Sequence, residues 1–384
     1  MPVNMRHPEI NKKKCLIYRD AKRSISVTEA SVPEIHRGQH WQRFLVWLLF
    51  PLCVLILTAC TRAVDHHFDD YQGRLARLLD TDIPTAPLPE NPRMPRTQSV
   101  QQAIPEFSIG LLASTRLNRC RAGALVAERN SSLGRVQSVD ARLLYEIRMI
   151  DALQDCLNSP VAESDDLREI LESALAHKID TLPLWIDRFL TSDDVIRSRL
   201  RVSRSPLTLD GTDPAEASIA ALTYFADVFA ALNADPKGYQ VDPSAWTSHM
   251  RTLGQQDFLS DLWRTQQVVQ QGLITSNELL ENAAQRVGCA RVGTPREAEY
   301  LQNVMMNFWI EGLQGQLARL QGYQHQVSRE LERLTAHVLH PEWTAYIESL
   351  VGTDSIAERN RALTREHAEL WQVFLEQCDL RIGS

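Results

Sequence analysis

The densest cluster of polar side chains on an apolar background in this sequence is Glu128, Arg129, Asn130 and Ser131. If the protein is an enzyme that acts on peptidoglycan or a lipid, its site would lie here, between Glu128 and Ser132. The alternative is structural: Arg129 is buried on the inner face of a helix and forms an ion pair with Glu146 that fixes helix packing. We favour the structural interpretation, which predicts that replacing Arg129 lowers thermal stability.

A second group with suggestive spacing is His337, His340 and Glu342. A helix would place both histidines on one face, but Pro341 ends that helix and no third ligand follows. We therefore favour a solvated helix end over a metal site, and predict neither metal nor cofactor. The sequence also lacks the Gly-x-Ser-x-Gly, phosphate-loop and His-Glu-x-x-His patterns, which removes common hydrolase and nucleotide chemistries. We favour a protein that is not an enzyme.

Cys60 has the clearest chemistry of any residue. It ends an uncharged apolar run that begins at Phe44 and closes with Leu57-Thr58-Ala59-Cys60. A bilayer-spanning helix needs about 20 apolar residues, whereas the apolar part of a cleaved signal has about 7 to 15. Thr58 and Ala59 are small enough for a peptidase pocket, and the Cys60 thiol can accept diacylglycerol. We predict cleavage before Cys60 and lipid anchoring through it; the alternative is an uncleaved signal anchor.

The region before this run is basic. Residues 1–43 hold nine Lys and Arg against four Asp and Glu, a net charge of +5, as expected of the end of a signal that stays in the cytoplasm. We predict a disordered n-region or an incorrectly assigned start at 1–43, followed by the apolar part of the signal at 44–59. A lipid anchor, short helix and Pro-rich spacer then occupy 60–105, and an all-helical periplasmic domain occupies 106–384.

Without residues 1–59 the chain is strongly acidic. Removing nine basic and four acidic residues from the totals of 41 and 48 leaves 32 and 44, a net charge of −12. Nucleic-acid binding depends on neutralising phosphates, so we predict no nucleic-acid partner.

Helical periodicity dominates downstream of Cys60. A short helix is predicted from Asp65 to Leu79, where Phe68, Tyr71, Leu75 and Leu78 recur at spacings of three and four. Six prolines between 83 and 105 then forbid a helix and favour an extended spacer, which either holds the body off the membrane or straps across its surface. From Glu106 onward the period is helical almost everywhere, which predicts an all-α multi-helix bundle.

Several of these helices have recognisable ends. We predict a helix over Ala124 to Leu133 that ends at Gly134, a second over Asp140 to Leu157, and a third over Leu167 to Leu190 with an interruption near Pro183. Further helices are predicted from Asp242-Pro243 and from Pro295 to Val338. The last is predicted over Ile356 to Cys378, after the capping box at Ser355. Between Arg199 and Gly211 alternation briefly replaces the helical period, which allows a small hairpin.

Some of these residues are also found together in a known family. They are Cys120, Leu125 to Val136, Leu144 to Glu146, Cys156, Cys289, Tyr300 to Val304 and Trp371 to Cys378. In these positions the chain resembles an uncharacterised family of bacterial lipoproteins, domain of unknown function 3080. The resemblance covers nearly the whole mature chain and is most specific at Glu128 to Gly134. It implies a location in the cell envelope and brings no activity with it.

Four cysteines remain after Cys60, and in an oxidising compartment they are expected to form two disulfides. Four thiols allow three pairings. We predict local pairing, Cys120 with Cys156 and Cys289 with Cys378. The first pair would join the ends of two helices, and the second would fasten the last helix beside the start of the longest one.

Together these patterns predict a non-enzymatic helical interaction module that is anchored in the membrane by lipid at Cys60 and faces the periplasm. Its partner would be an unknown envelope protein. An Asp after the lipidated cysteine retains many lipoproteins in the inner membrane. Thr61 occupies that position here, so we expect the outer membrane.

Overall fold

A computed structural model describes residues 63–108, 116–132, 134–289 and 295–381. All regular elements within these ranges are helices, so the prediction of an all-α fold is confirmed. They are α2 (Val64–Leu78), α4 (Arg121–Asn130), α5 (Val139–Leu157), α6 (Asp165–Ser192), α7 (Asp194–Leu200), α8 (Ala215–Ala234), α9 (Pro243–Gln255), α10 (Phe258–Leu280), α11 (Ala283–Arg286), α12 (Arg296–Val304), α13 (Gln314–Thr335), α14 (Pro341–Val351) and α15 (Ile356–Gln377), with the 3-10 turns η1 (Thr97–Val100), η2 (Gly134–Val136) and η3 (Pro160–Glu163) and the π-helix η4 (Met305–Leu313).

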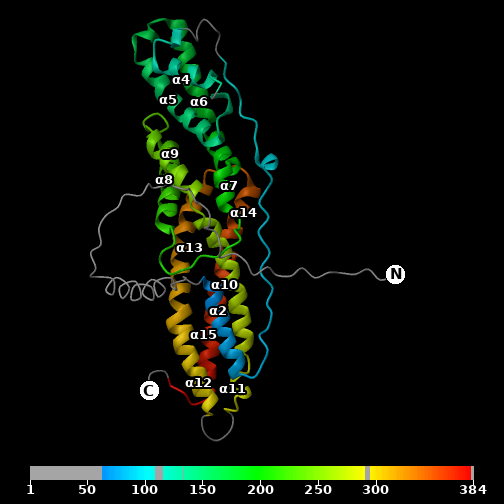
Figure 1. Cartoon of the computed structure of the whole chain (residues 1–384). Coiled ribbons are helices and arrows are strands. Elements are labelled where there is room, and N and C mark those ends of the chain that lie inside the picture. Colours follow the sequence, from blue (N-terminus) through cyan, green and yellow to red (C-terminus); the bar gives the residue numbers. More distant parts are fainter. Residues whose placement is uncertain (1–62, 109–115, 133, 290–294, 382–384) are drawn as a thin grey trace, which may run out of the picture. The chain divides into compact units, whose positions relative to one another are not determined.

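One bundle forms around α2, which begins and ends one residue before the predicted short helix. α2 packs against α10, α12 and η4, and α10 packs in turn along α15 (Figure 1). The α2–α10 contact is close because Gly272 has no side chain: a Cβ there would lie 2.5 Å from the Phe68 ring. The apolar stripe read from the sequence therefore faces the interior, with Tyr71 and Leu75 fully buried.

A second group consists of α4, α5 and α6, which pack on one another in chain order (Figure 1). α6 is continuous through Pro183, so the predicted interruption there is wrong. Pro183 is exposed while its neighbours Leu182 and Ile186 are buried. Burial of the opposite face offsets the backbone hydrogen bond that proline cannot donate.

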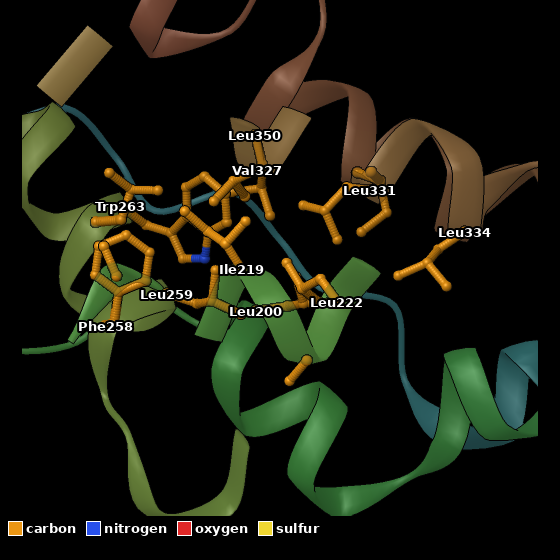
Figure 2. Close-up of a cluster of buried hydrophobic side chains, with 14 of the residues drawn as sticks. Leu200, Ile219, Leu222, Phe258, Leu259, Trp263, Val327, Leu331, Leu334 and Leu350 are labelled. Atoms are coloured by element: carbon orange, nitrogen blue, oxygen red, sulfur yellow. The ribbon is translucent and has the colours of Figure 1, made fainter. Parts of the chain in front are cut away.

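The helices α7, α8, α10, α13 and α14 share an apolar core. Figure 2 shows Leu200, Ile219, Leu222, Phe258, Leu259, Trp263, Val327, Leu331, Leu334 and Leu350 gathered there, and each is less than a tenth exposed. Burying a leucine side chain stabilises the fold by about 1.5 to 3 kcal/mol. By length and composition α8 could cross a membrane, but 56% of its most apolar stretch is buried inside the body.

The long helix predicted from Pro295 to Val338 is divided into α12, η4 and α13, which follow one another without a gap. The π-helix includes Gly312, one of three glycines in this region. Two of the expected helix starts are confirmed by their caps. The Asp242 side chain accepts from Ser244 N at 2.8 Å, and the Ser355 hydroxyl accepts from Glu358 N at 3.4 Å.

The hairpin expected between Arg199 and Gly211 is absent: α7 continues to Leu200, and the rest of this segment is a loop without strands. Its backbone bonds to helices instead of to itself. Leu207 N donates to Thr265 Oγ1 at 2.8 Å, and Leu209 O accepts from Arg319. Leu209 is fully buried with a positive φ of 57°. Contacts with distant helices therefore override the local alternation.

The proline-rich residues 81–105, here called the strap, lie extended across the helices apart from the short turn η1 (Figure 1). Polar side chains of the body hold it by donating to its main-chain oxygens: Gln271 to Ala86 at 2.7 Å, Gln267 to Pro89 at 3.1 Å, Arg197 to Pro95 at 2.6 Å, Thr191 to Val100 at 3.4 Å, and Arg188 to Gln102. Val100 is fully buried. Of the two roles predicted for this segment, the strap across the surface is the one observed.

Both predicted disulfides are present. Cys120 pairs with Cys156 and joins the start of α4 to the end of α5. Cys289 pairs with Cys378 and fastens the end of α15 to the segment after α11.

Candidate functional site

The predicted polar cluster lies at the C-terminus of α4. Glu128, Asn130 and Ser131 are exposed and Arg129 is half-buried. The Ser131 hydroxyl donates to Glu128 O at 2.7 Å and accepts from Gly134 N at 3.0 Å, while Arg129 donates to Gly134 O. These contacts are those of a helix terminus. The hypothesis of an enzymatic site at Glu128 to Ser132 stays untested.

Gly134 allows the chain to fold back closely on the end of α4. A Cβ at this position would lie 2.2 Å from Glu128 O and 2.6 Å from Arg129 O. Gly134 opens the turn η2 and does not itself cap the helix, which ends at Asn130.

The predicted ion pair between Arg129 and Glu146 is wrong, because Glu146 has other partners. Its carboxylate, fully buried, accepts from Arg142 Nη2 at 2.5 Å and from Lys178 Nζ at 2.6 Å. Arg142 lies one turn earlier on α5 and Lys178 comes from α6. The Arg142 guanidinium also lies over the Trp185 ring, 4.7 Å from its centroid. A buried ion pair does fix helix packing here, but between α5 and α6.

We expect Glu146→Ala to lower the free energy of unfolding by about 3 to 5 kcal/mol, because two cations lose their shared partner in a buried setting. Arg129→Ala should cost only about 1 kcal/mol, because its guanidinium donates to one carbonyl at a partly exposed helix end. Guanidinium unfolding followed by circular dichroism measures both. Equal losses in the two variants would contradict this assignment.

His337 and His340 are partly buried, so the predicted solvated helix end is wrong. The His340 ring nitrogen Nε2 lies 3.5 Å from Oδ2 of the buried Asp187 on α6. The other Asp187 oxygen accepts from Leu339 N at 2.8 Å. His337 packs edge-on against Phe229, and burial lowers its pKa. The turn between α13 and α14 is thereby docked on α6 and α8.

The bundle around α2 contains a buried polar network that the sequence did not reveal. The Trp371 indole donates to Tyr71 Oη at 2.8 Å, and Tyr71 Oη lies 2.8 Å from His367 Nε2. His367 Nδ1 lies 2.7 Å from Asn277 Oδ1. Trp309 of the π-helix packs on the imidazole, with ring centroids 4.0 Å apart. Three helices and the π-helix therefore meet at one histidine.

The contacts determine the protonation state of His367. Asn277 Nδ2 donates to Leu363 O at 3.2 Å, which leaves its Oδ1 as the acceptor. His367 must then donate from Nδ1 and accept at Nε2 from the Tyr71 hydroxyl. Burial lowers the pKa of His367 to about 3, so the imidazole is neutral. A histidine with both nitrogens engaged inside a core acts here as a structural connector.

A cavity of about 570 Å³ opens between α10, η4, α13 and α15. Such a volume lies within the range of about 300 to 1,000 Å³ that small ligands occupy. Its apolar lining includes Val269, Ile310, Leu317, Ala318, Leu320 and Ala357. Gly315 also lines it, and a Cβ there would meet nothing within 4 Å. The cavity therefore has a largely apolar lining, and at Gly315 its wall lacks a side chain.

Three buried amides add polarity to this cavity, each at most 5% exposed. Gln266 Nε2 donates to Gln324 Oε1 at 3.1 Å, and Asn360 Nδ2 donates to Gln266 Oε1 at 2.8 Å. Gln324 Nε2 in turn donates to Leu350 O at 3.2 Å. Among the described residues, Asn360 Oδ1 has no hydrogen-bond partner. An unpaired buried acceptor costs about 1 to 3 kcal/mol, a cost that a ligand donor would relieve.

The charged lining of the cavity is positive. Arg361 and Arg365 line it, and no carboxylate of the described residues does. Arg361 is engaged by Glu358 at 2.8 Å. Within the described ranges Arg365 has neither an ion-pair nor a hydrogen-bond partner. Within the part of the chain that the structure describes, this cavity therefore combines an apolar lining, a buried acceptor without a partner and the exposed cation Arg365.

None of these cavity residues was predicted as a site. Gln266, Gln324 and Asn360 are separated by more than 30 residues from one another along the chain, so no local motif joins them. Cys60 lies outside the described residues.

Comparison with known families gives a match over most of the chain. A family model described as a protein of unknown function, DUF3080, matches residues 68–382. No curated protein and no solved structure matches the chain.

Proposed function

The chain belongs to the DUF3080 family of proteins of unknown function, and we propose that it is a lipid-anchored cell-envelope protein whose helical body is a non-enzymatic interaction module. The observation that carries this proposal is the combination of Leu57-Thr58-Ala59-Cys60 at the end of an apolar run with a downstream body closed by two disulfides. Disulfides persist in oxidising compartments, which supports export. The lipid would sit on Cys60.

The periplasmic face of the outer membrane is the proposed location, because Thr61 rather than Asp follows Cys60. The cavity between α10, α13 and α15 supports the interaction role, since it offers apolar surface with a free acceptor and a free cation. The net charge of −12 downstream of the signal argues against nucleic acid as the partner. An envelope protein or a wall component remains as the partner class.

We expect metabolic labelling with palmitate to mark the wild-type protein, and Cys60→Ala to lose the label and keep the unprocessed size. The reason is that both acyl attachment and cleavage depend on the thiol at that position. Gel fluorography of the immunoprecipitated protein measures both features. Cys53→Ala is the matched control, because it removes a thiol from the signal and should leave label and processing unchanged.

Label that survives in Cys60→Ala would refute lipidation at this residue. Membrane fractionation on a density gradient tests sorting separately: recovery in the inner membrane would overturn only the outer-membrane assignment. Cross-linking and pull-down of the lipidated protein from membranes would then identify the partner.

A further inference from the structure

The face of α15 that lines the cavity carries a polar stripe. Asn360, Arg361, Thr364 and Arg365 stand at spacings of one, four and five residues, which places them on one side of a helix. Asn360 Oδ1 is buried without a donor, and Arg365 is exposed at the cavity, where it can pair with an anion. Val269 and Leu317 contribute to the apolar part of the lining. A ligand that fits must supply an N–H or O–H donor, an anionic group and a small apolar portion together.

We propose that this cavity binds the carboxy-terminal end of a peptide. The terminal carboxylate would pair with the guanidinium of Arg365, because a planar guanidinium can donate two parallel hydrogen bonds to a carboxylate. The last amide N–H would donate to Asn360 Oδ1, and the terminal apolar side chain would occupy the space beside Gly315. This inference deepens the proposed interaction role and rests on it for biological meaning, although binding itself does not depend on the lipid.

Other ligand classes satisfy only part of these requirements. A fatty acid offers a carboxylate and an apolar chain but no donor for Asn360 Oδ1. Free phosphate offers charge and no apolar portion for Leu317 and Leu320. A peptide terminus has all three groups on adjacent atoms. Two sources share this chemistry, the carboxy-terminus of an envelope protein and the D-amino-acid terminus of a wall stem peptide, and probes of each chirality distinguish them.

Gly315 offers a way to fill the cavity without disturbing the fold. A side chain there projects into open space, and replacing glycine inside a helix favours the helical state by up to about 1 kcal/mol. Gly322 lies two turns later on α13, is equally open, and is not part of the lining. Gly315→Leu and Gly322→Leu are therefore a matched pair that differ in whether the leucine enters the cavity.

The test is isothermal titration of the full chain in detergent with N-acetyl-Ala-Ala and N-acetyl-D-Ala-D-Ala, each as the free acid and as the C-terminal amide. We expect one or both free acids to bind, with affinity at least tenfold weaker for the amide, for Gly315→Leu and for Arg365→Gln. Gly322→Leu should bind within twofold of wild type. Preference for the L or the D probe then assigns the source.

Absence of binding by both acids, equal affinity for acid and amide, or equal loss in Gly315→Leu and Gly322→Leu would each overturn the proposal. Binding of dodecanoate at this cavity in place of the peptides would overturn it in favour of a fatty acid. Failure here leaves the palmitate experiment on Cys60 unaffected, so the two proposals fail separately.

Discussion

Replacement of His367 by alanine is expected to lower the free energy of unfolding by about 3 to 5 kcal/mol. The imidazole fills a fully buried site beside Trp309, so its removal leaves a cavity. It also leaves the Tyr71 hydroxyl and Asn277 Oδ1 without their partner at 2.8 and 2.7 Å. Guanidinium unfolding at pH 7 measures the loss.

The same residue should make the wild type sensitive to acid. Burial lowers the folded-state pKa of His367 from 6.5 to about 3. Between these values the unfolded chain binds a proton that the folded chain does not, so stability is present above pH 6.5 and lost as pH falls toward 3. From pH 7 to pH 5 the free energy of unfolding should fall by about 2 kcal/mol because of His367. The His367→Ala variant should not show this part of the pH dependence.

Comparing the pH dependence of the free energy of unfolding in His367→Ala with that of the wild type isolates the contribution of His367. Burial raises the pKa of Asp193 to about 6, which acts in the opposite direction because its stabilising effect is present at low pH and lost as pH rises through 6. Asp193 is common to both proteins and cancels in the difference. His325→Ala, an exposed histidine on α13, should change stability by less than about 0.5 kcal/mol. An unchanged pH slope in His367→Ala would contradict a neutral buried imidazole.

The second large effect is expected from the disulfide between Cys289 and Cys378. It closes a sequence separation of 89 residues, against 36 for Cys120 and Cys156. In the chain-entropy model the longer loop stabilises by about 4.5 kcal/mol and the shorter by about 4 kcal/mol. Cys378 also directly follows α15, which carries Trp371 and His367. Loss of the longer link should therefore loosen the polar network as well.

The double variants Cys289→Ala/Cys378→Ala and Cys120→Ala/Cys156→Ala form the comparison. Denaturant unfolding under oxidising conditions should rank the first as less stable. Addition of a reductant should bring the wild type and both variants to a similar, lower stability, because both links are then open in every protein. A more severe loss in the Cys120 and Cys156 variant would contradict the loop-length argument.

Much of the helical architecture could be predicted because its signals are local. The α2 stripe, the Asp242 and Ser355 caps and the end of α5 at Leu157 all follow from residues within one or two turns. Each of these features depends on the type and spacing of neighbouring residues, which the sequence displays directly. The disulfide pairing is confirmed as well, although its partners stand 36 and 89 residues apart.

The errors concern contacts between distant segments. Glu146 is predicted to pair with Arg129, yet one of its partners is Lys178 of the next helix. The other, Arg142 on the same helix, stands at an i,i+4 spacing that the sequence does display. The alternation before Gly211 is overridden by an acceptor on α10, Thr265, and a donor on α13, Arg319. His367 and Asn360 carry no local motif, because their roles depend on which residues of other helices come within hydrogen-bond distance. Sequence spacing alone does not contain that information.

The strap also determines where substitutions can accumulate. Ala86, Pro89, Pro95, Val100, Gln102 and Pro105 all accept through main-chain oxygens, and every amino acid has that atom. Proline loses nothing by lacking an N–H, because the helices supply the donors. Strap positions with exposed side chains can therefore change identity freely, whereas the buried Ala86 and Val100 in the strap and Gln267, Gln271 and Arg197 on the helices cannot. The position of the strap therefore depends on the identity of helix side chains more than on the identity of its own residues.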